Sequence, residues 1–101
     1  MAERDHHISQ AEAVALIGAH KVAKGEPRAW MFSRGIIDEI LAQPKCSGLR
    51  IYLAGAGAET TVVMVGTDGT NVDLADGVIA ERGWPCPPDC PDSSPLDVST
   101  P

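Results

Sequence analysis

The chain has 101 residues, 44% of them hydrophobic and 22% charged, which is typical of one small globular domain. Its formal net charge is −6, from 14 acidic and 8 basic residues. Nucleic acids and anionic membrane surfaces attract clustered Lys and Arg, so we expect neither among its partners.

No stretch of the sequence approaches the roughly 18 consecutive apolar residues of a transmembrane helix. The N-terminal sequence MAERDHHISQ also lacks the apolar region of a secretory signal. We therefore expect a cytoplasmic protein. Its three cysteines should then be reduced unless a metal or a redox cycle holds them.

Residues 9–24 predict a first helix. Ser9 followed by Glu12 fits a capping box, in which each residue satisfies a backbone amide of the other. Gly25 is a natural stop, with Pro27 just beyond it. The apolar face of this helix would consist of Ala13, Val14, Leu16 and Ile17.

Residues 32–44 predict a second helix. Ser33 is its expected N-cap, Phe32 and Ile37 occupy the positions of a hydrophobic staple, and Pro44 ends it. Arg34, Asp38 and Glu39 would point to solvent. The opposite, apolar face would consist of Ile36, Ile37, Ile40 and Leu41.

After this helix the hydrophobic period shortens to two. Residues 48–53 alternate, with Leu49, Ile51 and Leu53 facing one way, which predicts a strand. Residues 60–68 predict a second strand, and the glycine-bearing turn between them makes the pair an antiparallel hairpin. Residues 72–83 fit either short strands or a short helix, with a bend at Asp76–Gly77.

These elements predict an α+β fold with two helices packed on a small antiparallel sheet. The sheet and helices would form a single domain of residues 1–84. Six of the eight prolines lie within residues 85–101. Proline lacks the amide donor and disfavours a helical residue before it, so this C-terminal tail should be extended.

Three segments of the sequence resemble a group of small bacterial proteins, many of them from Bacteroidetes. They are ILAQPKCSGLRIYL, VVMVGTDGTN and ERGWPCPPDCPDSSPLD, spread over roughly residues 36–97. The most specific part of the group's pattern is the tail, C-P-P-x-C-P-x-x-S-P-L. Leu53 and Thr67 depart from the pattern. The resemblance marks Cys46, Cys86 and Cys90 as pattern positions but implies no activity.

A metal site is one interpretation of the cysteines. Thiolates bind zinc at about 2.3 Å, and the C-x-x-x-C spacing of Cys86 and Cys90 lies within the broad range of ligand spacings. Cys46, just beyond a helix end, could turn toward them. His20, within the apolar face of the first helix, is the best candidate for a fourth ligand. The cofactor would be zinc or an iron–sulfur cluster.

Two other interpretations of the cysteines stay open. Cys86 and Cys90 could form a disulfide, or Cys46 could join one of them. Alternatively, the cysteines are small buried hydrophobic residues and the tail packs on its own domain. The residues expected to make interactions are Trp84, Pro87, Pro88 and Leu96.

No catalytic signature stands out, and we assign no catalytic residue. A Cys46–His20 dyad would have only its residue types in its favour. The sequence favours a non-enzymatic binding or assembly module that docks through its tail to a protein partner or a second copy. The alternative is a small metal-binding or thiol redox protein that uses Cys46, Cys86 and Cys90.

Overall fold

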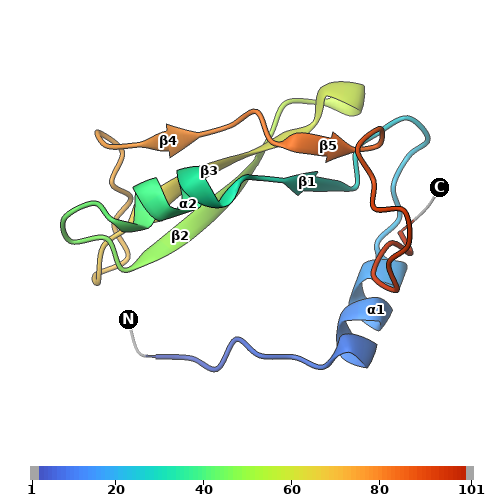
Figure 1. Cartoon of the computed structure of the whole chain (residues 1–101), viewed down its shortest axis with the longest axis horizontal. Helices are drawn as coiled ribbons and strands as arrows, with labels where there is room; N and C mark the ends of the chain where they lie inside the picture. Colours follow the sequence, from blue (N-terminus) through green and yellow to red (C-terminus); the bar gives the residue numbers. More distant parts are fainter. Residues whose placement is uncertain (1–2, 100–101) are drawn as a thin grey trace.

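The structure is a computed structural model that describes residues 3–99, and it confirms the α+β class (Figure 1). Two short antiparallel sheets lie side by side, with one helix on the larger sheet and the other helix apart from it. The elements are α1 (Gln10–Ala19), β1 (Ala29–Met31), α2 (Arg34–Leu41), β2 (Gly48–Ala54), a 3-10 turn (Gly57–Glu59), β3 (Thr61–Thr67), β4 (Ile79–Ala80) and β5 (Trp84–Cys86).

The larger sheet has the strand order β2-β3-β4. Strands β2 and β3 form the predicted hairpin, in a register that runs from Gly48 opposite Thr67 to Ala54 opposite Thr61. Gly55 starts the connecting turn with a φ of +71°, and a Cβ there would lie 2.4 Å from the carbonyl oxygen of Glu59. Only glycine fits that position. The ambiguous segment after the hairpin contributes only the two-residue strand β4.

The core lies between this sheet and α2. Ile40 is fully buried, and it packs with Met64 of β3 and Ala80 of β4, which are each 4% exposed. Ser33 is the N-cap of α2, as predicted. The partly buried residues around this cluster are Phe32, Ile36, Ile37, Cys46, Leu49 and Val78. The predicted apolar face of α2 therefore meets the sheet, although Leu41 at its end is 43% exposed.

Helix α1 begins as predicted but lies elsewhere. The Glu12 amide donates to the Ser9 hydroxyl over 3.1 Å, and the Ser9 amide donates to the Glu12 carboxylate. The helix ends at Ala19, well before Gly25, and buries no residue. It lies beside the C-terminal segment instead of on the sheet (Figure 1). The reason is strand β1, which the sequence did not indicate and which holds the preceding chain near β5.

Strands β1 and β5 form a two-stranded ribbon that joins the middle of the chain to its end. Ala29 lies opposite Cys86, and Met31 lies opposite Trp84. The predicted boundary between residues 1–84 and the tail therefore falls inside β5. From residue 87 to residue 99 the chain forms turns and irregular structure, with no helix or strand.

Candidate functional site

Cys86 and Cys90 form a disulfide at the beginning of the tail, with a Cα–Cα distance of 4.6 Å. Cys86 is the last residue of β5, and a tight turn brings Cys90 back toward it. In that turn the Asp89 amide donates to the Pro85 carbonyl over 2.8 Å, and the Cys90 amide donates to the Pro88 carbonyl over 3.0 Å. Disulfides and dithiols interconvert, so the pairing alone selects none of the predicted roles.

Arg28 and Asp97 complete this cluster from distant parts of the chain. The Arg28 guanidinium donates to both carboxylate oxygens of Asp97, over 2.7 and 3.2 Å, and its Nη2 lies 3.5 Å from Cys90 Sγ. The two side chains are only 17% and 24% exposed. The hydrogen bond from Arg28 lowers the pKa of Asp97 below its ordinary value, and Asp97 in turn raises the pKa of Arg28.

The donor atoms of Cys86, Cys90 and Asp97 all lie within 4.8 Å of one another. No other group of three His, Cys, Asp or Glu side chains within residues 3–99 converges in this way. Neither Asp97 nor Arg28 was predicted from the sequence. Arg28 and Cys90 are 62 residues apart, and no local spacing pattern could relate them.

Cys46 is not part of this cluster. It is a free, partly buried cysteine in the loop after α2, next to the core residue Ile40. Its sulfur donates to the Gly48 carbonyl over 3.4 Å and packs against Gly66 of β3. In Figure 1 that loop lies at the end of the larger sheet away from β5. The structure therefore brings Cys86 and Cys90 together without Cys46.

His20 also lies outside the cluster. It is the C-cap residue of α1, its backbone amide donates to the Ile17 carbonyl over 3.1 Å, and it is exposed. The predicted set of Cys46, Cys86, Cys90 and His20 is thus not assembled in this arrangement of the chain.

The residues predicted to make interactions are largely exposed. Trp84 is 48% exposed beside Met31, which is 58% exposed, and Leu96 is 41% exposed. Pro87 and Pro88 are also on the surface. Leu96 borders a pocket of about 270 Å³ together with Ile17 of α1 and the Arg28–Asp97 pair. The tail thus partly packs on its own domain and partly presents apolar side chains to solvent.

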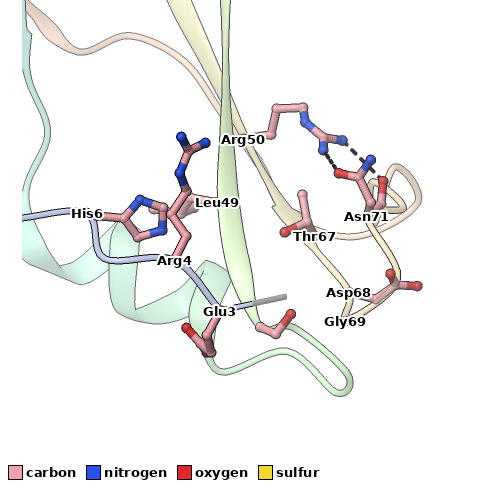
Figure 2. A pocket seen from close by; sticks show the side chains of 10 residues that line it. Glu3, Arg4, His6, Leu49, Arg50, Thr67, Asp68, Gly69 and Asn71 are labelled. Atoms are coloured by element: carbon pink, nitrogen blue, oxygen red, sulfur yellow. Dashed lines mark hydrogen bonds between the residues drawn. The ribbon is translucent and has the colours of Figure 1, made fainter. Parts of the chain in front are cut away.

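A larger pocket of about 430 Å³ lies between the N-terminal segment and the beginning of β2 (Figure 2). Glu3, Arg4 and His6 border it on one side, and Arg50 with the turn after β3 borders it on the other. Arg50 donates to the backbone and side-chain oxygens of Asn71. Charges of both signs line this pocket, so their fields offset each other and favour neither anions nor cations.

A polar network on the β2 strand anchors the same Arg50. Arg50 and the Tyr52 hydroxyl both donate to the Asp73 carboxylate. The Tyr52 bond, followed by that of Arg50, lowers the pKa of Asp73 below its ordinary value. The network fixes the turn after β3 against β2. The Asp73 carboxylate neutralises the charge of Arg50.

Comparisons with protein-family models, with curated protein sequences and with solved structures found no match. Among the described residues, no helix has both the length and the apolar character needed to cross a bilayer.

Proposed function

We propose that the protein is a binding module that assembles with a second copy of itself through the outer edge of strand β2. The observation that carries the proposal is the size of its surface. The chain exposes 7383 Å² of accessible surface, whereas a compact monomer of 10.6 kDa exposes about 5,500 Å². The excess of about 1,900 Å² exceeds the roughly 800 Å² that each partner buries in a standard interface.

The dimensions of the chain support the same proposal. Its Cα radius of gyration is 15.1 Å, against about 12.7 Å for a compact domain of this length. Helix α1 and the segment before it bury no residue of their own. A single copy therefore leaves large apolar side chains in water, and burying those of the β2 edge in an assembly would lower its free energy.

The edge of β2 is the most suitable place for that assembly. In the sheet order β2-β3-β4, β2 has a neighbouring strand on one side only. Three successive large side chains near its end are exposed, Ile51 by 62%, Tyr52 by 47% and Leu53 by 79%. Natural edge strands are usually protected by proline, lysine or a bulge, and this half of β2 has none of these.

The same strand from a second copy is a suitable occupant of this edge. If two β2 strands pair antiparallel about a two-fold axis at Tyr52, Ile51 lies opposite Leu53 of the partner subunit. Arg50 then lies opposite Ala54 of the partner subunit, so no like charges meet. Ile51 and Leu53 point to the same side of the sheet as the core residue Met64, because they pair with Met64 and Val62 of β3, but they lie beyond the part that α2 covers. The pairing would thus extend the core across the interface.

The docking role predicted for the tail and the cytoplasmic location both stay predictions. Arg28, just before β1, and Asp97 hold the tail to the domain, and Ser99 is only 4% exposed. These contacts favour the sheet edge over the tail as the first surface to test.

A pair of matched substitutions tests the proposed edge. Leu53→Arg and Leu16→Arg make the same chemical change at residues that are 79% and 66% exposed, on β2 and on α1 respectively. We expect Leu53→Arg to raise the dimer dissociation constant by about tenfold or more, because it places two like charges within the new sheet. Leu16→Arg should leave the constant unchanged. Equal effects of the two variants, or none, in sedimentation velocity over a dilution series would refute the β2 edge as the interface.

A further inference from the structure

We propose that Cys86, Cys90 and Asp97 form a binding site for a thiophilic divalent cation, such as zinc, once the disulfide is reduced. The three donor atoms already lie within 4.8 Å of one another in the oxidised protein. Cysteine thiolates and aspartate carboxylates are both ligands that zinc accepts in proteins. This site differs from the one that the sequence suggested, because it excludes Cys46 and His20 and adds Asp97.

Backbone hydrogen bonds hold the segment around the site in addition to the disulfide. Cys86 belongs to β5, and its carbonyl accepts a 2.7 Å bond from the amide of Arg28, the residue just before β1. The amides of Asp89 and Cys90 are bonded within the turn, whose prolines restrict its unfolded conformations. Reduction therefore leaves two thiols on backbone positions that stay close, with a Cα–Cα distance of 4.6 Å in the oxidised chain. Little ordering entropy would oppose metal binding.

An external dithiol would reduce the Cys86–Cys90 disulfide. The dithiol transfers two electrons and two protons to the Cys86–Cys90 bond and itself becomes a disulfide. Each cysteine thiol then loses its proton to water when the cation binds. Rotation of the side chains must separate the sulfurs to about 3.8 Å, the spacing of two thiolates at 2.3 Å around a tetrahedral zinc. Water would occupy the fourth position, as in open zinc sites.

In the oxidised protein, Arg28 donates hydrogen bonds to the Asp97 carboxylate and balances its charge. Its guanidinium lies against Asp97 and against Cys90 Sγ, at 2.7 and 3.5 Å, which is where a cation between these two ligands would bind. A divalent cation would replace this side chain, which can turn toward the adjoining pocket that it already borders. The disulfide state would thus hold Arg28 at the cluster, and the reduced state would hold the metal.

The test uses the full-length reduced protein, zinc and a chromophoric chelator as competitor. We expect one zinc per chain, and we expect Co²⁺ in place of zinc to give the intense near-ultraviolet absorption of a thiolate–cobalt bond. Oxidation to the disulfide should release the metal. Asp97→Asn, which keeps the shape of the side chain and can still accept from Arg28, should weaken zinc binding at least tenfold. Cys46→Ser should leave it unchanged.

Three results would overturn the proposal. The first is a reduced protein that retains its circular dichroism spectrum but binds no zinc. The second is zinc binding that persists in the Cys86→Ser, Cys90→Ser double variant. The third is binding that is lost in Cys46→Ser while the fold is kept. None of these measurements depends on the oligomeric state, so failure here is distinguishable from failure of the proposed β2 interface.

Discussion

Arg28 and Asp97 form a bidentate ion pair that joins the residue just before strand β1 to the end of the described chain. The pair joins Nε to Oδ1 over 2.7 Å and Nη2 to Oδ2 over 3.2 Å. Both side chains are mostly shielded from solvent, so water screens the pair less than it screens an exposed ion pair. The pair, together with the buried Ser99, holds the tail beside α1.

Lowering the pH should release the tail. Arg28 holds the pKa of Asp97 below its ordinary value of 3.8 in the folded chain. The stabilisation from this pair is therefore complete above the unfolded pKa and is lost as the pH falls through the lower, folded pKa. We expect the amide NMR signal of Ser99, which is 4% exposed, to move toward its random-coil position in that acid window.

Asp97→Asn provides the control for this pH dependence. The amide cannot titrate, so the Ser99 signal of the variant should show little change over the same acid window. Asp68 and Asp73 also have lowered pKa values, but they lie in the turn after β3. Signals from that turn should therefore change with pH in the same way in both proteins. Identical Ser99 profiles in the two proteins would show that this pair does not anchor the tail.

Replacing Ile40 by aspartate should unfold the larger sheet. Ile40 is fully buried between α2 and β3, and a charge there would be both desolvated and unpaired. The milder Ile40→Ala should cost about 2–5 kcal/mol of unfolding free energy. Leu41→Asp is the matched control, because Leu41 is the next residue along the helix and is 43% exposed. Circular dichroism and thermal melting should show a folded Leu41→Asp protein. A folded Ile40→Asp protein would contradict the position of the core.

Gly66→Ala should destabilise the protein through a clash with Cys46. An added Cβ at Gly66 would lie 2.8 Å from the Cys46 sulfur and 3.2 Å from both Gln43 and Ile40. Overpacking of this kind costs about 1–3 kcal/mol. Removing the sulfur with Cys46→Ala should recover part of that loss, so the double variant should be more stable than the two single effects predict. Additive effects in urea unfolding would argue against the contact.

Gly69→Ala is the comparison for Gly66→Ala. An added Cβ at Gly69 meets nothing within 4 Å, and its backbone does not have a positive φ. Its unfolding free energy should therefore stay close to that of the unchanged chain, within the roughly 0.5 kcal/mol typical of surface substitutions.

The elements that the sequence predicted are those with strong local signals. The alternation at residues 48–53 and the β-branched run after it specify the β2–β3 hairpin without help from distant residues. The apolar face of α2 and the Ser9–Glu12 capping box are similarly local. These signals depend only on residues close together in the chain, so the sequence alone predicts the elements.

The parts that the sequence did not predict depend on distant residues. Strand β1 has only three residues, and β5 contains Pro85, which cannot donate to a sheet, so neither has a recognisable pattern. Their pairing moves α1 away from the sheet and brings Arg28 and Asp97 to the tail cysteines. The composition of the cysteine cluster follows from that long-range pairing, which no spacing in the sequence encodes.

The mass of the unmodified chain in solution tests the central proposal most directly. Sedimentation equilibrium of the full-length protein should give about 21 kDa, twice the chain mass of 10.6 kDa, with a dissociation to the single-chain mass on dilution. The excess surface and the exposed β2 edge are the physical reasons for this expectation. A mass of 10.6 kDa at every accessible concentration would contradict the proposed self-assembly.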